Sequence, residues 1–307
     1  MAYKKIRKYN SDVHLYTFNP NEERLNLEIG KNKKLERPST VGIPNSDETI
    51  SCRTNAGFFN FNASSEHLGL LITNGLYYSP PNTVFIDLIF SKDKKLSITK
   101  VKNDTQTLNY LQGNSIFACG SSFSLIQNGK INLENCGFFD HYIYKAPRTA
   151  IGQKTNGDIV LCVVDGRSSF NSGVTGKQLA QILLDENCIV ATNFDGGGSS
   201  SMVIGNKVIN KPSDGSERYV GSVFVVYKKK NTSTSPTLST FPVLRKGSKG
   251  EYVKQMQKLL NQKGFNAGIE DGIAGNMTIV ALKTFQKAYG LESDGICGKL
   301  SWIELLK

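Results

Sequence analysis

Short apolar runs separated by Gly- and Asn-rich stretches make up the first three quarters of the chain. The runs at 83–90, 158–164 and 222–227 have the length and apolar content of β-strands. The segment 174–183 differs, because its apolar residues recur at helical spacing and Thr175 precedes them as a candidate N-cap. This pattern predicts an α+β chain whose large domain mixes helices and strands.

A change of composition at 228–241 marks a candidate domain boundary. This stretch, KKKNTSTSPTLSTF, is charged and then rich in Ser, Thr and Pro, which is typical of a linker. It separates a large domain, 1–227, from a small one, 242–307. Three groups of apolar residues in the small part have helical spacing, so we expect a three-helix domain. The expected helices surround residues 253–260, 281–288 and 302–306.

Two related turns repeat within the small domain. DGIAG occupies 271–275 and DGICG occupies 294–298, 23 residues further on. Each Asp-Gly pair predicts a tight turn, and the second glycine of each motif allows a helix to begin close by. The repeat therefore predicts a pseudo-symmetric helical unit.

The net charge of +11 predicts an anionic partner. The lysines are scattered rather than clustered with aromatic residues, and no nucleic-acid-binding motif appears, so we expect an anionic polymer and no nucleic acid. No run approaches the roughly 18 apolar residues of a membrane span. Met1–Asn10 is basic and polar, and no apolar segment of a secretory signal follows it.

The cysteines and histidines do not form a metal-binding pattern. Six cysteines include no CxxC pair, and Cys162 and Cys188 lie in apolar runs, as core residues do. The three histidines lack the spacing of metal ligands. The sequence therefore requires no cofactor, and it leaves open a divalent cation held by Asp and Asn oxygens.

Four polar, Gly-rich motifs interrupt the apolar runs, and the last is the most informative. Three consecutive glycines, 196–198, are costly in backbone entropy and suit a loop whose N–H groups approach an anion. Asp195 precedes them, after the apolar run 189–191, which places a carboxylate at a strand end beside this loop. A tight turn with an Asp cap is the alternative. The four motifs lie at 54–60, 146–152, 164–168 and 193–202.

The other motifs supply further candidates. Arg148 and Arg167 have the chemistry of a bidentate phosphate clamp, or of surface ion pairs. Asp165 follows an apolar run as Asp195 does, but Asp-Gly is also a simple turn signal. Asn55 suits hydrogen bonding to a sugar or a place in a buried hairpin, and Arg218 is a weaker anion contact. No GxSxG or GxxxxGK[ST] motif is present, so neither a nucleophile elbow nor a P-loop is predicted.

Five motifs, in order, resemble the phosphodiester glycosidase family, which acts on N-acetylglucosamine-1-phosphodiesters. They are TNAGFFN, APRTAIG, VDGRS, GVTGKQLA and NFDGGGSS, spread over 51–227. Residues 242–307 resemble a peptidoglycan-binding domain of the three-helix type, through LRKGSKGEYVKQMQKLLNQKGF and the two Asp-Gly turns. The first fifty residues carry no recognisable motif.

The resemblance implies a cell-wall hydrolase that cleaves a sugar–phosphate glycosidic bond. Its partners would be peptidoglycan, an anionic wall glycopolymer and a sugar-phosphate substrate, at the cell wall or outside the cell, with a phage lysis route fitting the missing signal. The expected catalytic residues are Asp195, Asp165 and Arg148. The expected substrate-binding residues are Asn55, Arg167, Gly196, Gly197, Gly198, Ser199 and Arg218. An endolysin or autolysin that cuts the peptidoglycan glycan, and a non-catalytic wall-binding protein, are the alternatives.

Overall fold

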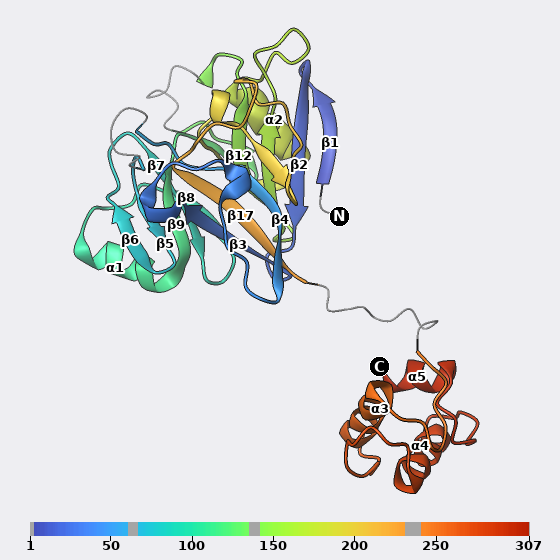
Figure 1. The fold of residues 1–307 in the computed structure, drawn as a ribbon. Coiled ribbons are helices and arrows are strands. Elements are labelled where there is room, and N and C mark those ends of the chain that lie inside the picture. Colours follow the sequence, from blue (N-terminus) through green and yellow to red (C-terminus); the bar gives the residue numbers. More distant parts are fainter. Residues whose placement is uncertain (1–2, 61–66, 135–141, 231–240, 307) are drawn as a thin grey trace. The chain divides into compact units, whose positions relative to one another are not determined.

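The computed structural model describes residues 3–60, 67–134, 142–230 and 241–306. They form two compact units, Met1–Lys230 and Asn231–Lys307 (Figure 1). Most of the expected linker, 231–240, lies outside the described residues, as do His141 and Cys136. None of the described helices is both long and apolar enough to cross a membrane.

Three sheets build the large unit, and every pairing of neighbouring strands in them is antiparallel. The seven-stranded sheet has the order β1 (Tyr3–Lys8), β2 (Ser11–Phe18), β13 (Ile159–Val164), β12 (Arg148–Lys154), β14 (Cys188–Asn193), β10 (Ser124–Gln127), β11 (Lys130–Ile131). A five-stranded sheet has the order β16 (Lys207–Val208), β15 (Met202–Ile204), β4 (Glu48–Asn55), β17 (Ser222–Lys229), β3 (Glu23–Ile29). A second five-stranded sheet has the order β6 (Leu76–Ser79), β5 (Leu71–Thr73), β9 (Ser115–Ser121), β7 (Ile86–Ser91), β8 (Leu96–Thr99).

The seven-stranded sheet is buried on both faces, which explains its continuous apolar runs. In β13, Leu161 and Val163 join a core shared with the two smaller sheets. Their neighbours Val160 and Cys162 face the opposite side, where helix α2 (Gly176–Asp185) covers the sheet. Because successive side chains of a strand point to opposite faces, a strand buried on both sides requires apolar residues throughout.

The N-terminal end of α2 is fixed by its own sequence. The Thr175 side chain accepts a hydrogen bond from the backbone N–H of Gln178, and the Gln178 side chain accepts one from the Thr175 N–H. This capping box satisfies two backbone donors that the helix cannot satisfy itself. Helix α1 (Thr105–Asn114) packs on the third sheet, against β5, β6 and β9 (Figure 1).

Most of the predicted elements are confirmed, and so is the α+β class. The predicted strand at 83–90 begins later, at Ile86, because Asn82 accepts hydrogen bonds from the N–H groups of Val84 and Phe85 in a turn. Cys162 and Cys188 are buried, as expected. The first fifty residues, although without a motif, supply β2 to the interior of the seven-stranded sheet.

The small unit contains three helices, α3 (Glu251–Gln262), α4 (Asn276–Ala288) and α5 (Lys299–Leu305). Gly275 and Gly298, the last residues of the two related turns, are the N-cap residues of α4 and α5. The predicted relation between these turns and the helix starts is therefore confirmed.

Two buried glutamines explain why the turn motif is repeated. Gln257 donates to the Asp271 carboxylate at 2.9 Å and to the Ile273 carbonyl at 3.1 Å, while its oxygen accepts the Gly272 N–H. Gln286 makes the same contacts with the second turn. Its partners are Asp294, Ile296 and Gly295. Each turn is thus held against the helix before it by one buried amide.

Candidate functional site

The glycine-rich loop that follows β14 is shaped by contacts at each glycine. Gly196 packs against the Pro147 carbonyl oxygen. Gly197 has a φ of 59°, a left-handed conformation that favours glycine, and lies beside the Arg167 guanidinium. At Gly198, a Cβ atom would collide with the paired side chains of Arg218 and Asp214. A side chain is therefore excluded at Gly196 by backbone, disfavoured at Gly197 by its φ, and accommodated at Gly198 only if the Arg218–Asp214 pair moves.

Two backbone N–H groups of this loop make hydrogen bonds within the protein. The N–H of Gly197 donates to the Pro147 carbonyl at 2.9 Å, and the N–H of Ser199 donates to the Gly196 carbonyl at 3.1 Å. An anion-binding concavity would therefore depend on the other N–H groups of the loop, and it stays a prediction. The loop also contributes its shape, because Gly196, Gly197 and Gly198 all line a pocket.

This pocket, of about 270 Å³, brings together residues that are distant in the sequence. Arg148 comes from the start of β12, Arg167 from the turn after β13, Asp195 from the end of β14, and Arg218 from the segment before β17. Phe58 completes one wall. With the three glycines of the loop, seven of the ten expected site residues thus lie around one space, which we call the arginine pocket.

Asp195 is the carboxylate of the arginine pocket. Burial raises the pKa of Asp195 to about 6, against the opposing effects of the Ser199 hydroxyl and the Arg218 charge. Its backbone N–H donates to the Ala56 carbonyl at 3.1 Å, which fixes its position. A carboxyl group with this pKa exchanges its proton near neutral pH, as acid–base catalysts do.

Three guanidinium groups line the same pocket as this carboxylate. Arg148 is buried and donates to the Val174 and Tyr144 carbonyls at 3.1 and 2.8 Å. Burial, and then the charge of Arg167, lower the pKa of Arg148 to about 10, so it stays charged at neutral pH. Arg218 forms an ion pair of 2.6 Å with Asp214. The three guanidinium groups outnumber the two carboxylates, Asp195 and Asp214, by one positive charge. This excess matches the single negative charge of a phosphodiester.

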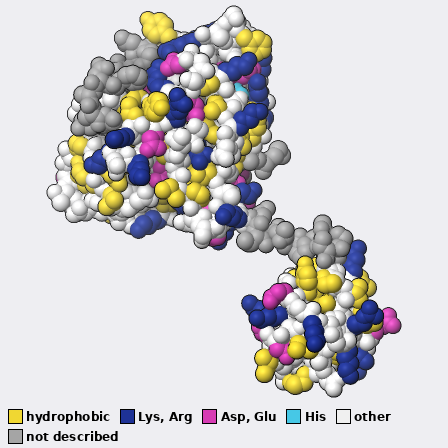
Figure 2. Space-filling model, in the orientation of Figure 1, with side chains coloured by type: hydrophobic (Ala, Val, Ile, Leu, Met, Phe, Trp, Pro, Cys, Tyr) yellow, Lys and Arg dark blue, Asp and Glu magenta, His cyan; other side chains and the backbone are white. Residues whose placement is uncertain are grey.

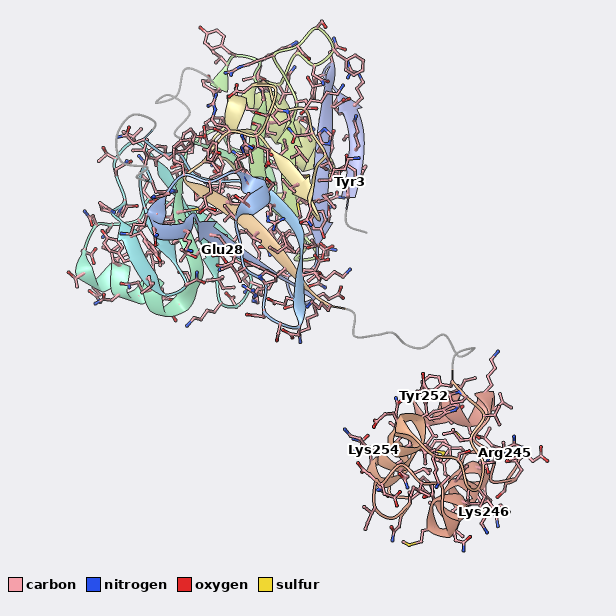
Figure 3. The ribbon with its side chains drawn as sticks, in the orientation of Figure 1. Tyr3, Glu28, Arg245, Lys246, Tyr252 and Lys254 are labelled. Atoms are coloured by element: carbon pink, nitrogen blue, oxygen red, sulfur yellow. The ribbon has the colours of Figure 1, made fainter. Side chains whose placement is uncertain are left out.

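Asp165 is not a second carboxylate of the arginine pocket. It is buried, and its oxygens bind His14 Nε2 at 3.3 Å, Asn210 Nδ2 at 3.1 Å and the Lys211 N–H at 3.0 Å. His14 is held from its other side by the Tyr3 hydroxyl at 3.0 Å, from the edge strand β1 (Figure 3). Asp165 does not line the arginine pocket and its oxygens are occupied by these partners, so the geometry favours a structural role over the predicted catalytic one.

Asp165 instead stabilises the glycine-rich loop through its contact with Asn210. Asn210, which Asp165 holds, donates to the Ser200 carbonyl at 3.0 Å and accepts from the Met202 N–H at 2.8 Å. The end of the loop is therefore tied to β13 through one buried carboxylate and one amide. Breaking such a network leaves a buried charge without partners, which is strongly destabilising.

Asn55 also lies beneath the loop rather than in the pocket. Its side chain is fully buried, donates to the Asp195 carbonyl at 2.6 Å, and accepts from Thr149 Oγ1 at 2.7 Å and the Ser201 N–H at 3.1 Å. We correct its predicted contact with the substrate, because these bonds leave no room for one. Asn55 therefore positions the backbone of Asp195, and Ser199 is likewise buried at the base of the loop.

Several residues that matter for the site could not be found from the motifs. His14, Asn210 and Asp214 act only through partners that are distant in the sequence or unremarkable in it. Phe58 was visible as part of TNAGFFN, without a role. Among the described residues, no group of three or more His, Cys, Asp or Glu side chains is placed to hold a metal ion.

Comparisons with known proteins identify the families of both units. The family model described as phosphodiester glycosidase matches residues 48–227, and the model described as putative peptidoglycan binding domain matches 249–303. The catalytic domain of the zebrafish N-acetylglucosamine-1-phosphodiester α-N-acetylglucosaminidase, auto-inhibited by its pro-peptide, superposes with a TM-score of 0.58 at 19% identity. The match covers 74% of this chain and 81% of that one. At this identity, the superposition shows a shared fold.

Similarity to curated proteins is local. An uncharacterised SPbeta prophage-derived protein of Bacillus subtilis is 49% identical over 76 residues, which are 25% of this chain and 12% of that protein. The N-acetylglucosamine-1-phosphodiester α-N-acetylglucosaminidase of Bos taurus is 31% identical over 102 residues, 29% of this chain and 19% of the enzyme. The chain thus matches less than a fifth of the length of either protein. The family model, by contrast, spans more than half of the chain, which therefore belongs to the phosphodiester glycosidase family and carries a C-terminal peptidoglycan-binding domain.

Proposed function

We propose that the large unit hydrolyses the bond between C1 of an N-acetylglucosamine-like sugar and a phosphodiester. The observation that carries this proposal is the arginine pocket, where one carboxylate with a raised pKa lies among three guanidinium groups. A neutral glycan would give no reason for this excess of positive charge. The name of the bovine relative supports the choice of sugar and bond.

In this reaction, the phosphate is both the group that is recognised and the group that leaves. The guanidinium groups of Arg148, Arg167 and Arg218 bind the diester and stabilise the charge that grows on it as the C1–O bond breaks. Because a phosphate monoester is a good leaving group, protonation by a general acid is not needed. This agrees with the single carboxylate in the described pocket lining.

Asp195 acts on the other side of the breaking bond. As a carboxylate, it takes a proton from the attacking water and stabilises the positive charge that develops on the sugar ring. The water oxygen forms the new bond to C1, and the phosphate leaves with the bonding electron pair. The proton passes from Asp195 to solvent, which restores the carboxylate.

The small unit directs this activity to the cell wall. A peptidoglycan-binding domain in the same chain raises the local concentration of the enzyme at its substrate. Lys and Arg side chains are spread over the visible surface of both units (Figure 2), which suits an anionic wall glycopolymer. The substrate we propose is a sugar-1-phosphate linkage in such a polymer, at the wall or outside the cell.

Hydrolysis of a soluble diester tests the proposal. Methyl N-acetyl-α-glucosamine 1-phosphodiester and purified peptidoglycan are each incubated with the wild type and with Asp195→Asn, and products are followed by NMR. We expect free N-acetylglucosamine and methyl phosphate from the wild type alone. Solubilised peptidoglycan with an intact diester would favour the endolysin or autolysin alternative. No product from either would favour a non-catalytic wall-binding protein.

A further inference from the structure

A groove of about 400 Å³ follows one side of helix α3 in the small unit. Most of its lining residues recur along that helix at spacings of three and four residues, which place them on one face. Tyr252 and Lys254 are among them (Figure 3), and Glu270 comes from the loop before the first Asp-Gly turn. We call this the α3 groove, and its lining residues are Glu251, Tyr252, Lys254, Gln255, Lys258 and Glu270.

The two sides of the α3 groove are held together by contacts within the small unit. The Gly250 N–H, at the start of α3, donates to the Gly272 carbonyl at 2.9 Å, which joins the helix to the turn that follows Glu270. Gln257 holds the same turn from the buried side of α3. Binding in the groove therefore does not require the backbone to reorganise.

Tyr252 provides an aromatic surface at a fixed place. Its ring packs edge-on against Phe241, with 5.7 Å between the ring centres, and Phe241 stacks on the buried Trp302 at 4.4 Å. Tyr252 nevertheless keeps 42% of its surface exposed. A ring that is anchored on one side and exposed on the other suits an aliphatic part of a ligand.

The charged side chains of the α3 groove balance in sign. Lys254 and Lys258 are ammonium groups, and Glu251 and Glu270 are carboxylates. Within residues 241–306, as the structure describes them, none of the four forms an ion pair, and Glu270 accepts a long hydrogen bond of 3.5 Å from Asn261. Such a groove is complementary to a ligand that carries both charges, and it gives a pure polyanion little net attraction at this place.

The internal repeat of the small unit supplies a comparison. Aligning its two buried glutamines places Lys283 and Lys287 of α4 at the positions of the two lysines of the α3 groove. Val280 and Ser293 occupy the positions of the two carboxylates. Both repeats thus have a pair of lysines, and only the first has carboxylates at these positions.

The lysines of the two repeats also lie differently. A Cβ atom at Gly295 would meet Lys283 Cε at 2.8 Å, so this side chain extends over the second turn. At the equivalent Gly272, the backbone of Gly250 is nearest, and Lys254 approaches only with its Cβ, at 3.7 Å. The Lys254 side chain therefore does not cover the first turn, and it lines the groove instead.

We propose that the α3 groove binds the stem peptide of peptidoglycan, at a residue that carries both a free amino group and a free carboxylate. The two lysines bind carboxylates of the peptide, the two glutamates bind its ammonium group, and Tyr252 packs on its aliphatic chain. The sugar backbone of peptidoglycan carries no such pair of charges. The inference rests on the wall-binding role in the proposed function and deepens it, because it names the part of peptidoglycan that is bound.

Binding of two soluble probes to the full chain, measured by calorimetry, tests this. One is the tripeptide L-alanyl-γ-D-glutamyl-meso-diaminopimelate, which carries both charges, and the other is chitotetraose, a neutral N-acetylglucosamine oligomer. We expect Tyr252→Ala to weaken binding of the tripeptide about tenfold. Lys254→Ala and Lys258→Ala should each weaken it about threefold, and less at high salt. Chitotetraose binding that is lost in Tyr252→Ala would place the glycan in the groove and overturn the inference.

Glu251→Gln distinguishes a peptide site from a site for anions alone. Loss of this carboxylate should weaken tripeptide binding about threefold, whereas it would strengthen binding at a site that takes only anions. The matched control is Lys283→Ala, at the equivalent position of the second repeat, which should leave tripeptide binding unchanged. Tighter binding in Glu251→Gln, or an equal loss in Lys283→Ala, would overturn the inference. The fluorescence of Trp302 in urea checks that the small unit of each variant is folded.

Pelleting with purified peptidoglycan separates this inference from the proposed function. We expect the full chain to pellet with intact peptidoglycan and not after an amidase has removed the stem peptides. Pelleting that survives this treatment, or that Tyr252→Ala and Lys254→Ala leave unchanged, would retain the wall-binding role and overturn the site. Groove-dependent binding of the tripeptide without pelleting would retain the site and contradict the wall-binding role.

Discussion

Replacing Asp195 with Asn should stabilise the protein at neutral pH while removing its activity. Burial disfavours the ionised form of this carboxyl group and raises its pKa from 3.8 to about 6. The unfolded chain has no such restraint, so the folded state must hold a charge that the unfolded state holds more easily. An amide of the same shape does not carry this cost.

The size of the effect follows from the pKa shift and depends on pH. Because the folded pKa is the higher one, the wild type loses stability as pH rises from about 4 to about 6, and the loss is complete above that range. At 1.36 kcal/mol per pKa unit, the free energy of unfolding of Asp195→Asn should exceed that of the wild type by about 3 kcal/mol at pH 8. At pH 4, the excess should fall to about 0.6 kcal/mol.

Urea unfolding at a series of pH values measures this difference. The single tryptophan, Trp302, is buried in the small unit, so its fluorescence reports that unit alone. Far-UV circular dichroism also reports the strands of the large unit, whose urea transition is expected to shift in Asp195→Asn. The fluorescence transition should be the same in both proteins, which makes it an internal control.

Asp87 provides a matched variant. It is buried in β7, burial raises the pKa of Asp87 to about 6, and it lies outside the arginine pocket. Asp87→Asn should therefore raise the free energy of unfolding of the large unit in the same pH range without reducing turnover. If Asp195→Asn were no more stable than the wild type at pH 8, or if the difference did not change with pH, burial would not be the cause of the raised pKa.

The remaining predictions concern the pocket and the wall. Gly198→Ala should destabilise the large unit by about 1–3 kcal/mol in thermal unfolding and reduce turnover in hydrolysis assays, because the new methyl group meets the Arg218–Asp214 pair. Gly113→Ala is the control, because its methyl group would lie in open space, and it should neither destabilise the unit nor reduce turnover. Arg148→Lys should lower kcat about 100-fold with the fold intact, since one ammonium cannot replace a guanidinium held by two carbonyls; an unchanged kcat would remove it from the chemistry. The value of kcat/KM should rise about tenfold per pH unit below pH 6 and level off above it; a fall over this range would make Asp195 an acid. Deleting 241–307 should abolish pelleting with purified walls and retain hydrolysis of the methyl diester, and pelleting that persists would contradict the division of roles.

Local sequence determines much of this fold, and those parts were predictable. The Thr175 capping box, the apolar run of β13 and the paired Asp-Gly turns each act over a few residues, so their meaning is visible in the chain itself. Arg148, Arg167 and Asp195 were also visible, because each lies in a Gly-rich motif where the backbone must turn, whereas Arg218, outside these motifs, had weaker support.

The site features that could not be predicted depend on burial and on contacts between residues distant in the sequence. Asp165 and Asp195 both follow apolar strands, and no local feature shows that one meets His14 and Asn210 while the other meets arginines. The glycine-rich loop was also ambiguous, since a requirement for close packing and a requirement for anion binding both select glycine. Those choices depend on neighbours brought in from 16 to 151 residues away.

The position of bond cleavage tests the central claim most directly. Methyl N-acetyl-α-glucosamine 1-phosphodiester is hydrolysed in water enriched in oxygen-18, and the two products are analysed by mass spectrometry. Attack at C1, with the phosphate as the leaving group held by the arginine pocket, places the heavy oxygen in N-acetylglucosamine and none in methyl phosphate. Heavy oxygen in the phosphate product would show attack at phosphorus, and would contradict the assignment of Asp195 and the three arginines to a glycosidase.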